Sequence, residues 1–467
     1  MFFWELSKYS DNVAIIDESG KETTYAKICE TADSIGKVLE KRAVAFVFCE
    51  NISDCVISYL SCLKNGVVPL LLDRKIDSEL AQRLISLYKP RYFFLPKDLE
   101  EDFAQGETVF ELESYKVLKT ENDIYPINDS LGLLLCTSGS VGSPKLVRQS
   151  YTNIQCNADA IAKYLELDEN ERPITTLPMN YTYGLSIINS HINSGSTILM
   201  TTSTVVSKAF WDFFKAKEAT SFGGVPFTYE MLKRIRFFKM DLPSLKTMTQ
   251  SGAKMTEDLY REFAEYAKAN GKRFVAMYGQ TEATSRMSYL PPEMATEKIG
   301  SIGKAIPGGK LMLIDTDGNE IKEAAATGEM VYAGPNVTLG YAQCADDLIK
   351  GDERNGRLPT GDIARRDEDG YYFIVGRIKR FLKLYGNRVN LDEIDRLVKS
   401  HFDIDCASVG TDSQCISYIT DPSLTDEVEA FLSKKTHLNS NAFKAVYIEE
   451  IPKNSSGKVL FSQLSNV

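Results

Sequence analysis

The chain has 467 residues, of which 43% are hydrophobic and 25% are charged, and its formal net charge is −10 at pH 7. This length exceeds one ordinary hydrophobic core, so we expect two or more domains, and the composition excludes a disordered chain. The acidic balance argues against nucleic acid or an anionic membrane surface as the main partner. If the protein binds anions, the positive charge that holds them must be concentrated locally.

The cysteines, the apolar runs and the histidines indicate the cellular compartment and exclude some kinds of site. Nine cysteines are scattered without a C-x-x-C pair, which argues against a zinc ribbon or a disulfide framework and favours a reducing cytoplasm. The longest apolar runs have the length of core strands, so no membrane span is expected, and the first residues lack the pattern of a signal peptide. His191, His401 and His437 are far from any nucleophile in sequence and are expected to be surface or core residues.

Strand and helix patterns alternate over the first hundred residues. Ile28, Ala32, Ile35 and Leu39 recur at helical spacing behind the threonine at position 24. Such alternation predicts βαβ units and a parallel sheet covered on both faces. The expected strands are 14–16, 43–48, 67–72 and 91–95, and the expected helices are 24–40, 54–65 and 77–88.

The remaining chain predicts two further kinds of structure. An apolar strand over 131–136 and a helix over 152–165 continue the α/β pattern, whereas 304–341 contains short strands broken by Gly and Pro, typical of a small barrel or antiparallel sheet. The basic residues 377–380 precede a last compact segment. We therefore expect a large α/β domain over 1–376, with a small barrel-like sheet, and a small α+β domain over 377–467.

A loop suited to phosphate binding follows the strand at 131–136. Residues 137–145 read Thr-Ser-Gly-Ser-Val-Gly-Ser-Pro-Lys, in which glycines free backbone N–H groups for an anion, hydroxyls add donors and Lys145 adds charge. The spacing is not that of a Walker A loop, which disfavours a P-loop kinase. A flexible Ser/Gly surface turn is the alternative, and the loop by itself does not decide between them.

Four later motifs accompany this loop. They read Tyr-Gly-Gln-Thr-Glu at 278–282, Thr-Gly-Asp at 360–362, Gly-Arg at 376–377 and Pro-Lys-Asn-Ser-Ser-Gly-Lys at 452–458. Each is weak alone, but their order and spacing resemble the adenylate-forming superfamily of acyl-CoA synthetases, adenylation domains and luciferases. The resemblance runs from about Val13 to Leu464.

The resemblance implies a ligase that activates a small carboxylic acid with ATP. A carboxylate attacks the α-phosphate, and because two anions repel each other the site must neutralise the triphosphate and align the reactants. The acyl group then passes from AMP to the thiol of CoA or of a phosphopantetheine arm on an acyl or peptidyl carrier protein. Two half-reactions imply a mobile small domain.

The resemblance also assigns residues. It implies Lys458, Glu282 and Thr281 as catalytic, with Glu282 as the Mg²⁺ ligand. It implies that ATP is bound by Thr137, Ser138, Gly139, Ser140, Gly142, Lys145, Gly252, Ala253, Tyr278, Gly279, Asp362 and Arg377. It implies an acid pocket of Tyr181, Val225, Ser251, Gly252, Met277, Gly279 and Gly303. It implies a hinge at Lys379, and Lys383 and Gly386 beside the thiol-transfer step.

Departures from the family pattern leave alternatives open. Val141 replaces the usual threonine, and Tyr181 occupies a position often held by histidine or another aromatic residue. Residues 178–185 lack the Phe-Asp-x-Ser pattern that binds an α-amine, which lowers the case for a stand-alone amino-acid adenylating enzyme, and a short C-terminal segment makes a carrier-protein thiol compete with CoA. A catalytically silent binding relative would have lost Glu282, Asp362 or Lys458. The acid and the oligomeric state stay open.

Overall fold

The computed structural model of the chain divides into two compact units. The first comprises Met1–Lys310 with Tyr332–Leu358, and the second comprises Leu311–Val331 with Pro359–Val467. The expected domain boundary at residue 376 thus lies within the second unit. The reason is that most of the sheet formed by the strands before residue 376 belongs to the same unit as the C-terminal segment. The residues described by the structure are 2–99, 104–136, 145–384, 387–411, 413–436, 438–453 and 459–464.

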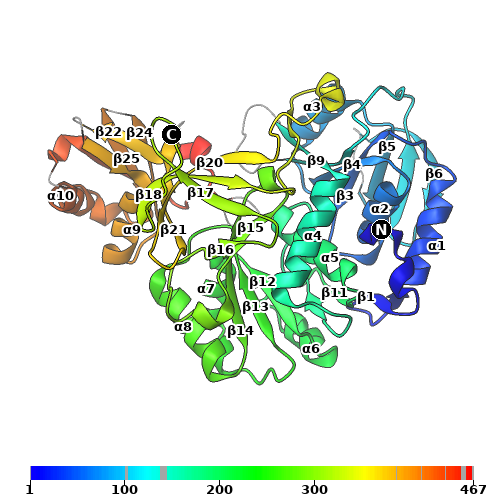
Figure 1. Ribbon diagram of the computed structural model, residues 1–467, viewed down its shortest axis with the longest axis horizontal. Helices are drawn as coiled ribbons and strands as arrows, with labels where there is room; N and C mark the ends of the chain where they lie inside the picture. Colours follow the sequence, from blue (N-terminus) through cyan, green and yellow to red (C-terminus); the bar gives the residue numbers. More distant parts are fainter. Residues whose placement is uncertain are drawn as a thin grey trace. The chain divides into compact units, whose positions relative to one another are not determined.

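Eight strands form one sheet of the first unit: β3 (Val44–Cys49), β4 (Val68–Asp73), β5 (Tyr92–Pro96), β6 (Glu107–Glu111), β7 (Tyr115–Lys119), β8 (Leu131–Cys136), β9 (Leu146–Ser150) and β19 (Gly340–Ala342). Their order is β19-β9-β8-β4-β3-β5-β7-β6 (Figure 1). The centre is parallel, since β3 pairs with β4 and β5, and β4 pairs with β8. The strands predicted for this centre are confirmed to within one residue at each end.

Helices cover both faces of this sheet: α1 (Tyr25–Gly36), α2 (Ser53–Lys64) and α3 (Ser78–Tyr88). Every residue of β3 is buried. Ala45 and Val47 belong to a core that includes α2, whereas Phe46 and Phe48 belong to a second core that includes Leu84 of α3. The predicted sheet with two covered faces is therefore confirmed.

Side-chain caps begin two of the predicted helices. The Thr24 hydroxyl accepts a hydrogen bond from the backbone N–H of Lys27 at 3.1 Å, and α1 follows. Helix α4 (Tyr151–Leu165) begins with a reciprocal capping box between Ser150 and Asn153. Both caps satisfy backbone N–H groups that the first helical turn leaves unpaired. The threonine cap predicted at position 24 is confirmed.

A second sheet contains nine strands: β1 (Val13–Asp17), β2 (Glu22–Thr24), β10 (Pro173–Ile174), β11 (Ile198–Met200), β12 (Ser221–Gly224), β13 (Thr247–Gln250), β14 (Arg273–Gly279), β15 (Arg286–Tyr289) and β16 (Lys304–Ala305). Strand β1 pairs antiparallel with β2 and in parallel with β11, with Ile15 opposite Ile198, and not with β3, β4 or β5 of the eight-stranded sheet. Strands β12, β13 and β14 are parallel, so the residues after their carboxyl ends meet at one edge of the sheet.

The accompanying helices are α5 (Thr182–Asn193), α6 (Lys208–Ala216), α7 (Pro226–Arg234) and α8 (Glu257–Ala269). Helices α4 and α5 lie side by side (Figure 1).

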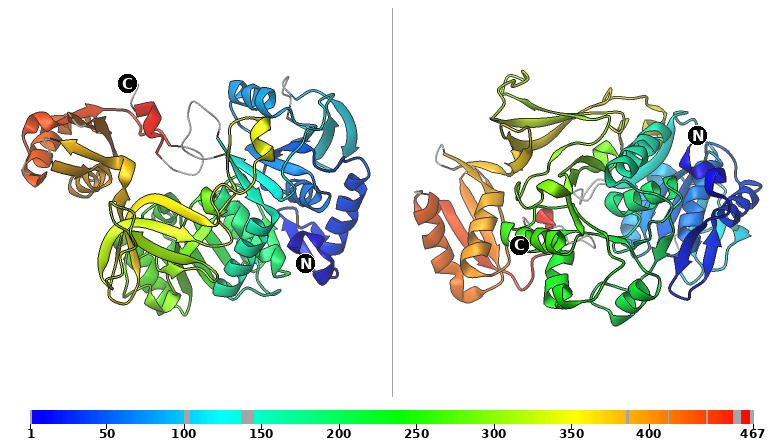
Figure 2. Two further views of the ribbon diagram at one scale, coloured as in Figure 1. Left: turned by 45° about the horizontal axis from the view of Figure 1, so that its top comes forward. Right: turned by 60° about the horizontal axis from the view of Figure 1, so that its bottom comes forward.

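The second unit consists of three small sheets. The strands are β17 (Lys310–Ile314), β18 (Ala326–Ala333), β20 (Arg357–Arg366) and β21 (Tyr372–Arg377), then β22 (Phe381–Leu384) and β23 (Asn387–Asn390), then β24 (Cys406–Thr411), β25 (Gln414–Ile419) and β26 (Phe443–Tyr447). Its helices are α9 (Leu391–Phe402), α10 (Thr425–Thr436) and α11 (Phe461–Leu464). Helices α9 and α10 lie beside the last sheet (Figure 2). Their buried apolar side chains share one core with it. Short strands predicted over 304–341 contribute to the first of these sheets.

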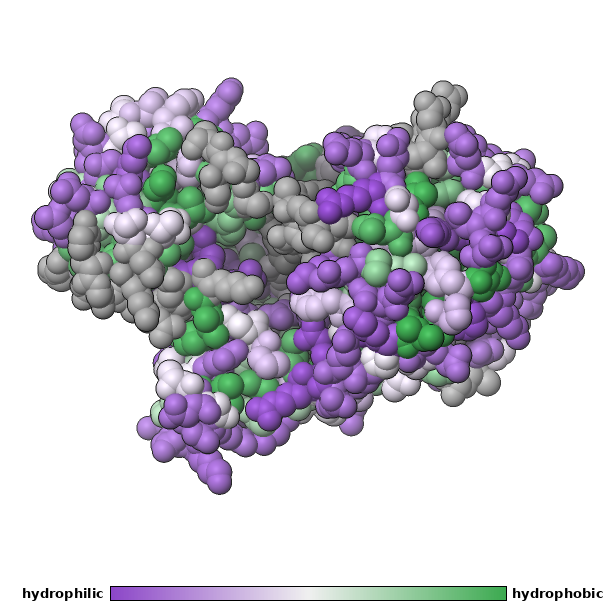
Figure 3. Space-filling model, turned by 90° about the horizontal axis from the view of Figure 1, so that it is seen from above, coloured by the Kyte–Doolittle hydropathy of each residue, from purple (hydrophilic) through white to green (hydrophobic). Residues whose placement is uncertain are grey.

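The surface is largely polar where it can be seen. The face in Figure 3 is mostly hydrophilic, and its apolar side chains occur in separate small groups. Among the described residues, no helix has both the length and the apolar character needed to cross a bilayer.

The histidines occupy different environments. His191 in α5 is buried, and its Nδ1 lies 2.8 Å from the carbonyl oxygen of Ile187, so Nδ1 carries the proton and Nε2 is an acceptor. Burial lowers the pKa of His191 from 6.5 to about 4, although the Ile187 carbonyl and the Glu171 carboxylate act in the opposite direction. His401 is exposed and stacks on Phe431, and His437 lies outside the described residues.

The buried imidazole predicts a loss of stability in mild acid. The folded state keeps His191 neutral, whereas the unfolded chain binds a proton below its pKa of 6.5, so the free energy of unfolding falls as the pH decreases. We expect protonation of His191 in the unfolded chain to lower the free energy of unfolding by about 2 kcal/mol between pH 7 and pH 5. Urea titrations of the wild type and of His191→Gln at both pH values measure it, with His401→Gln as the exposed control. An equal pH dependence in all three proteins would contradict the prediction.

Candidate functional site

The Tyr278–Glu282 motif begins in the last residues of β14 and continues past its carboxyl end. Strand β15 turns back over it, with Arg286 opposite Gly279, and a Cβ at Gly279 would lie 1.8 Å from the carbonyl oxygen of Ser285. Only glycine fits this approach. Thr281 and Glu282 then form one turn of 3-10 helix. The motif is thereby held in a tight reversal at the edge of the sheet where the parallel strands end.

The Glu282 side chain is held by residues far along the chain. Its Oε1 accepts a hydrogen bond from the Tyr341 hydroxyl at 2.6 Å. Its backbone carbonyl accepts hydrogen bonds from the Thr338 N–H at 3.0 Å and from the Thr338 hydroxyl at 2.9 Å. Among the described residues, no group donates to Oε2 of Glu282. The carboxylate is therefore oriented through one of its two oxygens.

Two cations surround the same tyrosine. The Lys145 Nζ lies 5.5 Å and the Arg354 guanidinium 4.8 Å from the centroid of the Tyr341 ring. Burial, followed by the Glu282 carboxylate, raises the pKa of Tyr341 to about 12, so its hydroxyl stays a donor at neutral pH. These side chains concentrate positive charge beside a carboxylate in an acidic protein. Neither Tyr341 nor Arg354 was among the residues predicted from sequence.

The described residues suit a magnesium–nucleotide site of the predicted kind. They contain no group of three or more His, Cys, Asp or Glu side chains that could hold a metal alone. Mg²⁺ is commonly bound through one or two carboxylates together with phosphate oxygens and water. A single oriented carboxylate beside cations for phosphate fits that pattern.

Several predicted acid-pocket residues lie together at the same sheet edge. Gly252 has φ +93°, and a Cβ there would lie 2.7 Å from the Tyr181 hydroxyl and 2.9 Å from Val225. Met277 belongs to the same apolar cluster as Tyr181 and Val225. Burial raises the pKa of Tyr181 to about 12. The structure thus joins residues that follow different strands into one apolar wall.

The other residues predicted beside this pocket also have defined places. Ser251 is buried, and its N–H donates to the Gly224 carbonyl at 3.2 Å. The carbonyl of Ala253, which is exposed, accepts a hydrogen bond from Gln250 at 2.9 Å. Gly303 has φ +80° and lies against the backbone of Tyr289, the residue paired with Met277.

Asp362 and Arg377 face each other across paired strands of the second unit. They are register partners in β20 and β21, and Arg377 Nε lies 3.3 Å from Asp362 Oδ1. The Asp362 side chain is 3% exposed and that of Arg377 is 61% exposed. The N–H of Asp362 donates to the Thr360 hydroxyl at 3.1 Å. The sequence prediction that Arg377 supports Asp362 is consistent with this geometry.

The segment after Arg377 is anchored within the second unit. Arg380 is buried and donates to Asp392 and Asp395, each at 2.6 Å, and its guanidinium lies 3.9 Å from the Phe461 ring centroid. Lys379 lies in the short 3-10 helix Ile378–Arg380, and Lys383 lies in β22; their side chains are not described. The backbone neighbouring the hinge prediction is thus tied to α9.

Some predicted residues lie outside the described parts of the chain. They are Thr137, Ser138, Gly139, Ser140 and Gly142 of the phosphate loop, Gly386, and Lys458. The flanks of the last motif are described: Lys453 and Val459 form an antiparallel bridge, and Lys453 Nζ donates to Asp405 at 2.9 Å. The two ends of the Lys458 loop are therefore brought together.

The fold and the arrangement of these motifs define an adenylate-forming enzyme. A family model described as AMP-binding enzyme matches residues 2–342. The chain belongs to the AMP-binding enzyme family.

Individual relatives agree with this membership. The 2-succinylbenzoate–CoA ligase of Geobacillus sp. (strain WCH70) is 28% identical over 488 residues, covering 98% of this chain and 95% of the relative. The oxalate–CoA ligase of Arabidopsis thaliana is 29% identical over 373 residues, covering 74% and 69%. The solved O-succinylbenzoate coenzyme A synthetase of Bacillus subtilis in complex with AMP has a TM-score of 0.82 at 22% identity, over 100% of this chain and 98% of that one. Another structure of that synthetase contains ATP and a magnesium ion.

These comparisons confirm the predicted α/β fold and the predicted enzyme class, an ATP-dependent acid–thiol ligase. They do not assign roles to single residues.

Proposed function

We propose that this ligase converts a small carboxylic acid, ATP and CoA into acyl-CoA, AMP and pyrophosphate through an acyl-adenylate. The observation that carries the proposal is the Glu282 carboxylate, oriented by Tyr341 beside Lys145 and Arg354. Lys145 is the last residue of the predicted phosphate loop, and the arrangement gives a metal–triphosphate complex both a ligand and counter-charges. The cysteine usage supports a cytoplasmic location.

In the first half-reaction, a carboxylate oxygen of the acid forms a bond to the α-phosphorus and the bond to the bridging oxygen breaks, releasing pyrophosphate. Glu282 would hold Mg²⁺, which when bound would supply positive charge that neutralises the phosphates. Lys145 and the loop before it stabilise the departing phosphates, and Lys458 stabilises the charge that develops at the α-phosphate. Tyr181, Val225 and Gly252 enclose the acid in an apolar wall that excludes water.

In the second half-reaction, the thiol gives up its proton to solvent and its sulfur forms a bond to the acyl carbonyl carbon, while the bond from that carbon to the phosphate oxygen breaks and AMP leaves with the electron pair. Asp362 accepts hydrogen bonds from the ribose hydroxyls, supported by Arg377, and keeps the nucleotide in place. Lys379 provides the hinge that brings Lys383 and Gly386 to the site. The names of the CoA-ligase relatives support CoA as the acceptor. A carrier-protein thiol and a stand-alone amino-acid adenylating activity are the alternatives that the test must exclude.

The test is ATP–pyrophosphate exchange over a panel of aliphatic acids, aromatic acids and amino acids. The best acid is then supplied with CoA or with a phosphopantetheinylated carrier protein, and thioester is quantified. We expect exchange with an acid that lacks an α-amine and thioester with CoA. Exchange with amino acids alone, or thioester on the carrier protein alone, would support an alternative. No exchange with any acid, in protein that still binds ATP, would refute ligase activity.

Tyr341 offers a specific check on the metal site. Tyr341→Phe removes the hydrogen bond to Glu282 but keeps the aromatic ring beside Lys145 and Arg354. A hydrogen bond to a charged group contributes about 1.5–3 kcal/mol, so we expect the KM for Mg·ATP to rise about 10-fold or more. Exchange rates measured against free Mg²⁺ concentration test this. The exposed Tyr447 provides the control, Tyr447→Phe, and equal magnesium dependence in both variants would contradict the prediction.

A further inference from the structure

Arg286 lies shortly after the Tyr278–Glu282 motif in sequence, and hydrogen bonds to its backbone hold it in place. It is the first residue of β15, and its carbonyl accepts hydrogen bonds from the side-chain amides of Asn157 at 2.9 Å and Asn336 at 3.1 Å. The position of its side chain relative to Gly279, its register partner, is therefore well defined.

The guanidinium is oriented by neutral groups. Its Nε donates to the Ser186 hydroxyl at 3.0 Å, and its Nη1 donates to the Tyr164 hydroxyl at 3.0 Å and to the Met277 sulfur at 3.2 Å. The guanidinium also lies 5.2 Å from the centroid of the Tyr183 ring. None of these groups carries a negative charge.

Arg286 differs in this respect from the other buried arginines of the described residues. Arg148, Arg286 and Arg380 are all buried. Arg148 pairs with Glu353 at 2.5 Å, and Arg380 pairs with two aspartates. Arg286 is 2% exposed and forms no ion pair with any described carboxylate, and its Nη2 donates no hydrogen bond to a described residue. Because an arginine stays protonated, its burial without an anion is costly.

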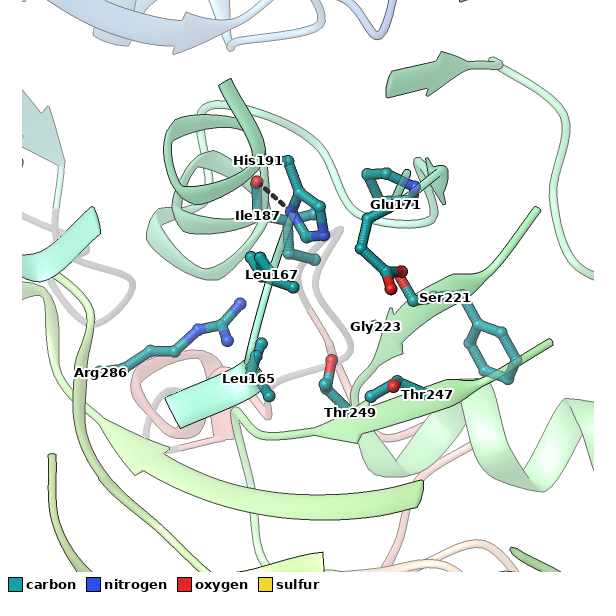
Figure 4. A pocket seen from close by; sticks show the side chains of 12 residues that line it. Leu165, Leu167, Glu171, Ile187, His191, Ser221, Gly223, Thr247, Thr249 and Arg286 are labelled. Carbon is teal, nitrogen blue, oxygen red and sulfur yellow. Dashed lines mark hydrogen bonds between the residues drawn. The ribbon is translucent and has the colours of Figure 1, made fainter. Parts of the chain in front are cut away.

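The guanidinium borders a small buried cavity, into which it points in Figure 4. His191 and Glu171 line the same cavity. The Glu171 carboxylate accepts hydrogen bonds from Thr220 at 2.5 Å and Lys246 at 3.2 Å, so its charge is already paired. The Nε2 of His191 is buried and has no hydrogen-bond partner. The cavity thus combines a cation that lacks a counter-ion with a neutral acceptor.

Side chains of the acid pocket connect to this cavity. Met277 contacts Arg286 through its sulfur and belongs to the apolar cluster of Tyr181 and Val225. The Tyr183 ring, which lies beside the guanidinium, packs edge-on against Tyr181 with centroids 6.3 Å apart. Arg286 therefore directly contacts one predicted acid-pocket residue, Met277, and lies beside Tyr183, which packs against another, Tyr181.

We propose that Arg286 binds a second carboxylate, at the end of the acid substrate away from the reacting carboxylate. The substrate class is then a dicarboxylic acid. The Nη2 of Arg286, which donates to no described residue, can give a charge-assisted hydrogen bond to an oxygen of that carboxylate. The inference rests on the proposed ligase function and specifies its substrate.

The test compares matched pairs of acids. Linear dicarboxylates from malonate to suberate are each assayed beside the corresponding monoamide by ATP–pyrophosphate exchange. We expect the wild type to prefer the best dicarboxylate over its monoamide by at least about 10-fold in kcat/KM. Arg286→Gln should lower kcat/KM for the dicarboxylate about 100-fold and leave that for the monoamide within about threefold. Arg286→Lys, which keeps a positive charge, should retain part of the preference.

Further measurements separate binding from folding and from turnover. Thermal unfolding and ATP affinity establish that Arg286→Gln is folded. Calorimetric titration of the dicarboxylate in the presence of a non-hydrolysable ATP analogue measures binding without catalysis, and Arg286→Gln should lose that binding. If no acid of any class supports exchange, the ligase proposal fails while the titration still decides the role of Arg286. If the wild type does not distinguish the paired acids, or Arg286→Gln weakens both equally, Arg286 is a structural residue and the inference is wrong.

Discussion

Lys458→Ala is expected to lower acid-dependent ATP–pyrophosphate exchange by about 10²–10³-fold, the size of effect seen when one preorganised charge-stabilising donor is removed. The reason is electrostatic. Negative charge accumulates at the α-phosphate when the carboxylate attacks, and an ammonium on a long side chain can meet it there and later withdraw. ATP affinity should change little, because the predicted triphosphate contacts come from Lys145 and the loop before it.

A control and a second substrate make this result specific. Lys444 is exposed in β26 of the same unit, so Lys444→Ala has the same charge change without a predicted role. Acyl-adenylate supplied directly, together with CoA, should still be converted by Lys458→Ala, because pyrophosphate departure has been bypassed. Unchanged exchange in Lys458→Ala, or an equal loss in Lys444→Ala, would show that the lysine assignment is wrong.

Glu282→Gln is expected to reduce kcat/KM for Mg·ATP by about 100-fold or more and to shift the magnesium requirement upward. The amide can still accept the hydrogen bond from Tyr341, so this variant removes the charge while keeping the shape and the contact. Loss of a hard carboxylate ligand weakens the metal that neutralises the phosphates, and about 3 kcal/mol of lost stabilisation corresponds to about 100-fold in rate.

The comparison with Tyr341→Phe separates two functions of the same carboxylate. Glu282→Gln tests its charge, and Tyr341→Phe tests its orientation, so the first should have the larger effect at saturating magnesium. Glu293 is exposed, and Glu293→Gln gives the matched loss of one carboxylate elsewhere. A magnesium dependence identical to wild type in Glu282→Gln would exclude this residue as the metal ligand.

Local patterns succeeded where the determining interactions are local. Helix α1 was predicted because an apolar stripe and the Thr24 cap lie within one short segment, and the cap accepts its hydrogen bond from Lys27 as expected. The central strands of the eight-stranded sheet were predicted because each is a continuous apolar run bounded by turns. Which strands pair with one another, in contrast, is not determined by a local pattern. Strand β1 was expected from its apolar residues, but no local signal indicates that it pairs with β11 in another sheet.

The sequence by itself determined the family, the chemistry and the order of the predicted site residues, because five short motifs in a defined order carry that information. Only the tertiary structure decided how Glu282 is held. Tyr341 is 59 positions away and carries no motif of its own, so its hydrogen bond exists only once β19 and the 3-10 turn after β14 are packed together. The same holds for Arg286: a sequence shows a positive charge, but whether a carboxylate pairs with it depends on what the surrounding helices and strands bring within reach.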